Sequence, residues 1–174
     1  MGRSGALSLI FVSCLLVAGL SRAEMLRPGD DFPEWRLPDQ TGTLMSASEL
    51  AGRSYLMWFY PRAMMPGCTL EGQVLRDHTE DLKHLQVLIL GVSFDDPATN
   101  ARFARRESFP FPLLSDRDGR LAIAVGAARR GDATAARVSY LVGPSGKVLK
   151  VYDTVNPGAH AVQVLRDLRD LSPE

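Results

Sequence analysis

The fold is decided by residues 55–71, which read YLMWFYPRAMMPGCTLE. The apolar run Tyr55–Tyr60 predicts a buried β-strand, because it is short, continuous and rich in aromatic side chains. Pro61 ends that strand, and Pro66-Gly67 closes a turn before a helical pattern that begins at Cys68. The stretch therefore predicts strand, turn and helix, with a thiol in the first turn of the helix.

The position of Cys68 favours chemical reactivity. Unpaired backbone N–H groups and the positive end of the helix dipole, both found at a helix N-terminus, favour a thiolate over a thiol. Only the thiolate is a strong nucleophile. The competing interpretation is a buried and inert cysteine, which is a common role for this residue type. We expect Cys68 to carry the chemistry.

The composition is typical of one soluble globular domain. The chain has 174 residues, of which 45% are hydrophobic and 23% are charged, with 20 basic and 20 acidic side chains. This length is enough for a domain with its own buried core. Binding to nucleic acid is not expected, because that function needs a clustered basic excess.

Residues 1–23 have the pattern of a secretory signal peptide. Arg3 supplies a positive charge, an apolar stretch follows from Ala6 to Leu20, and Ser21-Arg22-Ala23 offers small residues around a cleavage site. We expect residues 24–174 to form the mature domain, located in the periplasm or secreted. The apolar stretch is short for a transmembrane helix, so no stable membrane span is expected after cleavage. An uncleaved leader would anchor the protein in the membrane.

Cleavage would leave a single thiol. The chain has two cysteines, and Cys14 lies inside the predicted leader. A domain in which Cys68 is the only cysteine cannot form an internal disulfide. A thiol–disulfide oxidoreductase of the thioredoxin type would need a Cys-x-x-Cys pair, which the chain lacks.

The helix that begins at Cys68 is expected to continue as far as Leu85. One face would carry the residues that recur at helical spacing, namely Leu70, Val74, His78, Leu82 and Leu85. Apolar residues at these intervals predict the side of the helix that packs on a sheet.

The rest of the chain alternates strands with helices. We expect a hairpin over 35–45, a helical turn over 46–50, strands at 86–94 and 113–115, helices at 98–106 and 120–125, strands at 138–142 and 147–153, and a last helix that includes Leu171. This order predicts a three-layer α/β sandwich with a mixed sheet and an N-terminal hairpin. Cys68 would lie at the carboxyl end of a central strand, the edge where open α/β sheets form their sites.

The segment Phe59-Tyr60-Pro61, followed by Pro66-Gly67-Cys68-Thr69-Leu70-Glu71, resembles the active-site segment of the peroxiredoxins, the AhpC/TSA superfamily. The most similar subgroup is the bacterioferritin-comigratory, or PrxQ, type. Other segments that match in order along the chain are 91–95, 111–116, 137–142 and 144–147. The resemblance implies a thioredoxin-like fold and a thiol peroxidase.

The resemblance also implies roles for individual residues. The Cys68 thiolate would attack a hydroperoxide and become a sulfenic acid. Arg137 would stabilise the thiolate and the departing oxygen, and Pro61 would shield the thiolate. Tyr60, Met65 and Glu71 would form the surrounding pocket. Arg137 as a surface residue and Glu71 as a solvated acid of the first helical turn are the alternative interpretations.

Neither a metal nor a cofactor is expected. The three histidines have no metal-ligand spacing, so we expect them to be structural or surface residues: His78, His84 and His160. Arg129 and Arg130, which could compete with the site arginine, are expected to be solvated loop residues.

The chain departs from the family pattern at two positions. Met65 stands where the family has a Thr or Ser hydroxyl that hydrogen-bonds the peroxide, and a thioether cannot donate such a bond. Gln73 stands where many relatives have the resolving cysteine. These departures imply a one-cysteine cycle, in which an external thiol reductant (a thioredoxin-like protein or a low-molecular-weight thiol) acts on a monomer or weak dimer. The alternative function is a weakened peroxiredoxin-like thiol sensor or a redox-independent binding module.

Overall fold

Strand β3 lies at the centre of a five-stranded sheet with the strand order β5-β4-β3-β6-β7. The computed structural model describes residues 24–171. The strands are β1 (Arg36–Pro38), β2 (Leu44–Ser46), β3 (Ser54–Phe59), β4 (Val87–Ser93), β5 (Leu113–Ser115), β6 (Val138–Val142) and β7 (Val148–Tyr152). The helices are η1 (Ala47–Leu50, a 3-10 helix), α1 (Pro66–Asp77), α2 (Thr79–His84), α3 (Pro97–Glu107), α4 (Arg120–Ala124) and α5 (His160–Leu171).

The sheet is mixed, as the order of elements predicts. Strand β4 runs parallel to β3 and β5, whereas β6 runs antiparallel to β3 and β7. Strands β1 and β2 form a separate antiparallel hairpin. The expected α/β architecture with a mixed sheet, flanking helices and an N-terminal hairpin is therefore confirmed.

The period-two alternation of β3 feeds two cores. Leu56 and Trp58, with Tyr60 just beyond the strand, pack under α1, α2, α3 and α5. The alternate side chains, Met57 and Phe59, pack on the other face with η1, α4 and the N-terminal segment. Both sets are fully buried, so β3 reads as a continuous apolar run rather than an alternating one.

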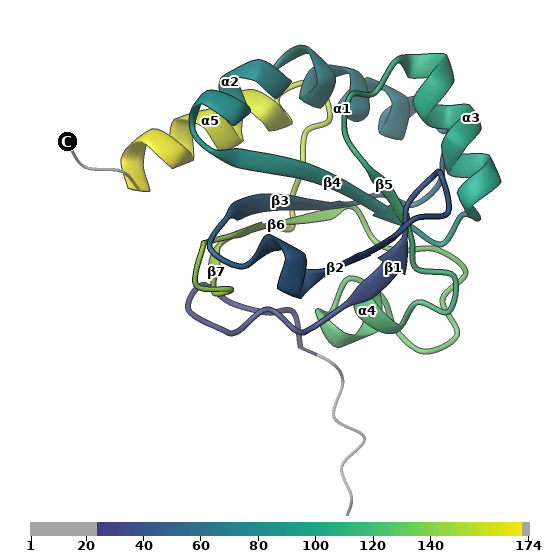
Figure 1. The fold of residues 1–174 in the computed structure, drawn as a ribbon, viewed down its shortest axis with the longest axis horizontal. Helices are drawn as coiled ribbons and strands as arrows, with labels where there is room; N and C mark the ends of the chain where they lie inside the picture. The colour runs from purple at the N-terminus through teal and green to yellow at the C-terminus, as the bar shows by residue number, and fades with distance from the viewer. Residues whose placement is uncertain (1–23, 172–174) are drawn as a thin grey trace, which may run out of the picture.

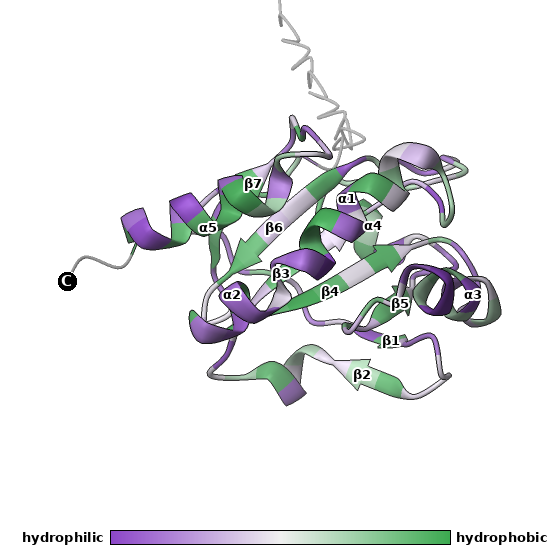
Figure 2. Ribbon diagram, turned by 90° about the horizontal axis from the view of Figure 1, so that it is seen from above, coloured by the Kyte–Doolittle hydropathy of each residue, from purple (hydrophilic) through white to green (hydrophobic). Residues whose placement is uncertain are grey.

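Helices cover the two faces of the sheet unequally. Helices α1, α2, α3 and α5 lie above the sheet in Figure 1, while the short α4 and the β1–β2 hairpin lie below it. Seen from above in Figure 2, the hydrophilic stretches are concentrated on the helices and the hydrophobic ones on the central strands. Within residues 24–171, no helix is long and apolar enough to cross a membrane.

One expectation about the helix after β3 is wrong. The chain forms two helices there, because His78 leaves helical geometry at φ −107° and ψ 14° and separates α1 from α2. Helix α1 begins at Pro66, two residues before the expected start, since proline suits the first turn of a helix.

The expected apolar face of this helix is also wrong. Leu70 is 47% exposed and Leu85 is 40% exposed. The buried positions of α1 are Cys68, Glu71, Gly72 and Leu75. A charged residue takes an interior position because it has a charged partner there, which a search for apolar periodicity does not detect.

The close packing of β4 against the aromatic layer gives a stability test at Gly91. A Cβ at this position would lie 2.5 Å from Leu113 Cδ2 and 3.2 Å from ring atoms of Trp58 and Tyr60. We expect Gly91→Ala to lower the free energy of unfolding by about 1–3 kcal/mol, the usual cost of overpacking a core. Urea denaturation measures this change.

The matched control is Gly158→Ala, because its Cβ would meet only ordinary contacts, at 3.7 and 3.9 Å. Its stability should stay within about 0.5 kcal/mol of the original protein. Equal stability of the two variants would contradict the tight-packing argument.

Candidate active site

Cys68 lies in the first turn of α1, at the carboxyl end of β3. Its side chain is 0% exposed. The chain reverses between the two elements through Met64, which has a left-handed backbone with φ 63°. The first helical turn is closed by Thr69 N, which donates to Met65 O at 2.8 Å. The thiol thus occupies the predicted position, near the free N–H groups of a helix start.

Arg137 reaches the thiol from a distant part of the chain. Its Nη2 donates to Cys68 Sγ at 3.5 Å, and its Nη1 donates to Gly67 O at 3.5 Å. The register of the sheet explains this approach: Phe59, the last residue of β3, pairs with Val138, so the preceding Arg137 lies beside the strand end. The arginine is therefore held at the thiol by strand pairing.

Glu71 completes a buried ion pair with this arginine. Arg137 Nη1 donates to Glu71 Oε2 in a short hydrogen bond, and the glutamate is fully buried. The interpretations of Glu71 as a solvated acid and of Arg137 as a surface residue are thereby excluded. Arg129 and Arg130, the possible competitors, are exposed.

The ion pair changes the acidity of both partners. Burial raises the pKa of Glu71 to about 7, although the charge of Arg137 acts in the opposite direction. Burial alone would lower the pKa of Arg137, but the negative charges at Glu71 and Cys68 outweigh it and raise the pKa above its usual value. Arg137 is thus a permanent cation beside the sulfur.

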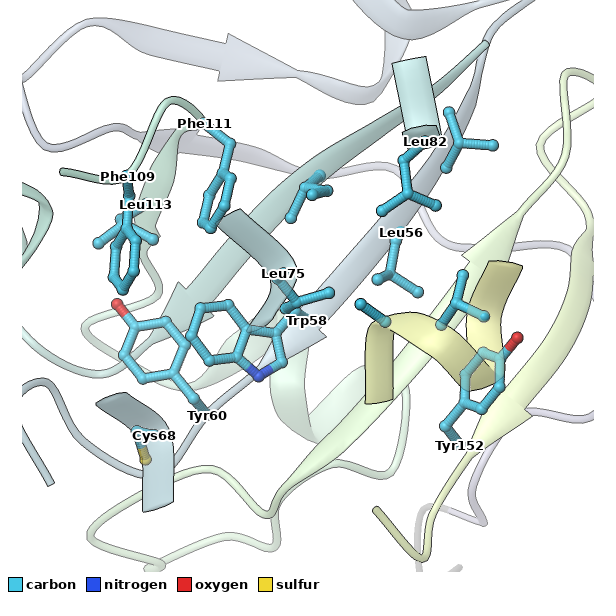
Figure 3. Close-up of a cluster of buried hydrophobic side chains, with 14 of the residues drawn as sticks. Leu56, Trp58, Tyr60, Cys68, Leu75, Leu82, Phe109, Phe111, Leu113 and Tyr152 are labelled. Carbon is cyan, nitrogen blue, oxygen red and sulfur yellow. The ribbon is translucent and has the colours of Figure 1, made fainter. Parts of the chain in front are cut away.

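Tyr60 lies near Cys68 but its hydroxyl faces away. Figure 3 shows the Tyr60 oxygen on the far side of the ring from Cys68, with the ring of Trp58 alongside. The hydroxyl donates to Asn100 Oδ1 at 2.7 Å. Tyr60 therefore supplies an apolar wall next to the thiol, with its polar atom committed to α3.

The segment between β3 and α1 holds the other two predicted pocket residues. Pro61 directly follows β3 and is partly buried. Met65 is the N-cap of α1, makes no side-chain capping bond and is 42% exposed. An N-cap threonine or serine would accept a bond from the first turn, so Met65 leaves the start of the helix with fewer polar contacts.

Gln73 has a structural contact of its own. Its Nε2 donates to Glu107 Oε2 at 2.8 Å, and Arg76 Nη1 donates to the Glu107 carbonyl oxygen at 2.7 Å. The middle of α1 is thus tied to the end of α3. Cys68 is the free cysteine of the described part of the chain.

Two further residues near the site escaped the sequence analysis. Asp95 Oδ2 accepts hydrogen bonds from Ala63 N at 2.8 Å and from Ser93 Oγ at 3.0 Å, which fixes the active-site loop to the end of β4. His160 is buried behind Glu71. The Gly91–Asp95 segment contains a signal for Asp95, but no spacing in the sequence connects His160 to Cys68.

The fold and the buried thiol–arginine site define a class of proteins, the peroxiredoxins. The model of the AhpC/TSA family matches residues 28–151. The chain belongs to that family.

Within the family the chain is a homologue of the Bcp/PrxQ subgroup. It is 36% identical over 152 residues to Peroxiredoxin Bcp of Escherichia coli strain K12, covering 83% of this chain and 97% of the relative. The crystal structure of Peroxidoxin BcpB from Mycobacterium tuberculosis superposes with a TM-score of 0.79 at 33% identity, covering 86% of this chain and all of that one. This similarity confirms the thioredoxin-like fold.

A third similar structure is that of a bacterioferritin comigratory protein from Xanthomonas campestris, which is described as having alkyl peroxide reduction activity. It has a TM-score of 0.73 and 29% identity, and the match covers 79% of this chain and 91% of that chain.

The raised pKa of Glu71 predicts a pH-dependent stability. The native state holds the Glu71 proton more tightly than the unfolded state does, so this group's contribution is full below pH 4.5 and is lost as the pH rises to about 7. Glu71→Gln removes this titration. The stability of the original protein relative to Glu71→Gln should therefore fall by roughly 2–3 kcal/mol between pH 4.5 and pH 8.

Urea denaturation of both proteins across this pH range measures the difference. The control is Glu80→Gln on α2, because Glu80 is an exposed acid paired with Lys83 on the surface. A Glu71→Gln curve parallel to that of the original protein would show that Glu71 does not titrate there.

Proposed function

We propose that the protein is a one-cysteine thiol peroxidase that reduces hydrogen peroxide and organic hydroperoxides. The observation that carries this proposal is the 3.5 Å contact between Arg137 Nη2 and Cys68 Sγ at the start of a helix. The positive charge and the helix dipole both favour the thiolate, and they also favour the negative charge that develops on a departing oxygen. Homology to the Bcp/PrxQ peroxiredoxins supports the same chemistry.

The proposed reaction has three steps. The Cys68 thiolate attacks one peroxide oxygen, the S–O bond forms as the O–O bond breaks, and the leaving alkoxide or hydroxide takes a proton to give an alcohol or water. A thiol then attacks the sulfenic acid, which releases water and leaves a mixed disulfide. A second thiol regenerates Cys68 and carries away the disulfide.

The resolving thiol is proposed to come from outside the chain, from a thioredoxin-like protein or a small thiol. Gln73 occupies the position of a resolving cysteine and is bonded to Glu107 instead. Since Cys68 is fully buried, the thiol reaches Sγ only when the first turn of α1 opens. The ties between α1 and Glu107 restrict that opening to the turn before Gln73.

We further propose that the protein acts in the periplasm or is secreted, as a monomer or weak dimer. The support for export is the leader pattern of residues 1–23, which lie outside the described residues. Uncleaved, the same segment would act as a membrane anchor. The mass of the protein isolated from cells distinguishes the two forms.

The peroxidase proposal predicts complete dependence on one sulfur atom. Cys68→Ser should abolish peroxide consumption, and the original protein should turn over only with an added thiol. Stopped-flow mixing with hydrogen peroxide, followed by mass spectrometry, should find one added oxygen on Cys68. Peroxide consumption that persists in Cys68→Ser would overturn the proposal. Cys14→Ser in the full chain is the matched control and should behave as the original.

A second candidate function is a slow peroxiredoxin-like thiol sensor or binding module. The observation that favours it is Met65, whose exposed thioether stands where a hydroxyl would bond the peroxide. Losing one positioned donor can slow a reaction by about 10²–10³-fold. A fast original protein would exclude this function.

Met65→Thr tests the decayed-catalysis interpretation. If the missing hydroxyl limits the rate, this variant should oxidise faster than the original by about 10-fold or more. The rate of Cys68 oxidation by hydrogen peroxide measures the gain. Met65→Val has a similar shape without the hydroxyl and is the control. Equal rates in Met65→Thr and Met65→Val would show that the hydroxyl position does not limit the reaction.

A further inference from the structure

Three buried polar side chains from different elements meet behind Arg137. They are Glu71 of α1, Ser139 of β6 and His160 at the start of α5, and each is 0% exposed. His160 Nε2 lies 2.9 Å from Ser139 Oγ and 3.9 Å from Glu71 Oε1. The thiol, the arginine, the glutamate and the histidine therefore form one continuous chain of contacts.

The histidine in this chain is neutral. Burial, together with the nearby positive charge of Arg137, lowers the pKa of His160 to about 4. A neutral imidazole has one N–H donor and one acceptor nitrogen. The other neighbour of the ring, Tyr152, packs edge-on with a centroid distance of 5.2 Å and is itself uncharged, because burial raises the pKa of its hydroxyl.

The surroundings of the ring indicate which nitrogen carries the proton. Within the described residues, His160 Nδ1 has no hydrogen-bond partner. A buried N–H without a partner is rarer than an unpaired acceptor, so we assign the proton to Nε2. That N–H faces Ser139 Oγ and the Glu71 carboxylate.

The two oxygens of Glu71 then have different tasks. Oε2 accepts from Arg137 Nη1, while Oε1 has no hydrogen-bond partner in the described residues and faces His160. At 3.9 Å the His160 contact is electrostatic, and a small rotation of the carboxylate would turn it into a hydrogen bond. A carboxylate attracted at both oxygens has one preferred orientation, and this orientation sets where Arg137 lies.

We propose that His160 is a positioning residue of the peroxidase site: it orients Glu71, and Glu71 in turn holds Arg137 Nη2 against Cys68 Sγ. This inference deepens the proposed function and rests on it for its role in peroxide reduction. The geometric claim, that His160 influences the state of the Cys68 sulfur through Glu71, does not need peroxide.

The test compares two amides at position 160. The amide group of glutamine reaches the place of Nε2, whereas the shorter asparagine reaches only the place of Nδ1. His160→Asn should slow oxidation of Cys68 by hydrogen peroxide about 10-fold, as expected when a residue that orients a reacting group loses its contact. His160→Gln should stay within about 3-fold of the original protein. Tyr152→Phe, which changes the other neighbour of the ring, should leave the rate unchanged.

A double-mutant cycle separates positioning from packing. In a Glu71→Gln background, His160→Asn should change the rate less than about 2-fold, because the carboxylate through which it acts is gone. A loss of helix packing would slow both backgrounds equally. Equal effects in the two backgrounds, or a His160→Gln variant as slow as His160→Asn, would overturn the inference.

The pH profile of Cys68 alkylation by iodoacetamide gives a readout without peroxide. It should move to higher pH in His160→Asn and not in His160→Gln, because a loosened Arg137 stabilises the thiolate less. An unchanged profile in His160→Asn overturns the role of His160. An original protein that alkylates normally but ignores peroxide overturns the peroxidase function instead.

Discussion

The ion pair between Glu71 and Arg137 is the interaction on which the site depends. A carboxylate with no exposed surface is costly to bury unless a cation compensates for its lost hydration. Arg137 provides that cation and at the same time touches the Cys68 sulfur. One guanidinium therefore serves a structural partner and a reactive one. Removing either charge of the pair would leave the other buried without a counter-charge, so neither side chain can be exchanged independently.

The sheet makes this pairing possible. Strand β6 runs antiparallel to β3, and Arg137 precedes β6 just where β3 ends. The aromatic layer beneath α1 is equally constrained, because Gly72 and Gly91 leave no room for a side chain against Trp58 and its neighbours. Helix α1 can therefore lie close to the sheet with Cys68 facing Arg137. The reactive geometry is a consequence of rigid elements rather than of a loop.

The two departures from the family pattern have different physical consequences. Met65 changes what a bound peroxide would meet at the N-cap of α1, and so bears on the rate. Gln73 changes what happens after the first step, because its amide binds Glu107 where many relatives have a second thiol. Both positions lie on α1 or at its edge, while the Cys68–Arg137 contact is retained. The chain thus keeps the part of the site that activates sulfur and differs in the parts that assist and complete the cycle.

The local pattern of the sequence determined the strand, the turn and the helix start that contain Cys68, since apolar runs and Pro-Gly turns act over a few residues. The resemblance to peroxiredoxins pointed to Arg137. Only the tertiary structure decided that Glu71 is buried, that Leu70 is exposed and that His160 stands behind the ion pair. Helical periodicity assigns charged residues to the solvent side, and it fails where a partner some 66 residues away supplies the opposite charge. Such pairings depend on strand register, which no short stretch of sequence contains.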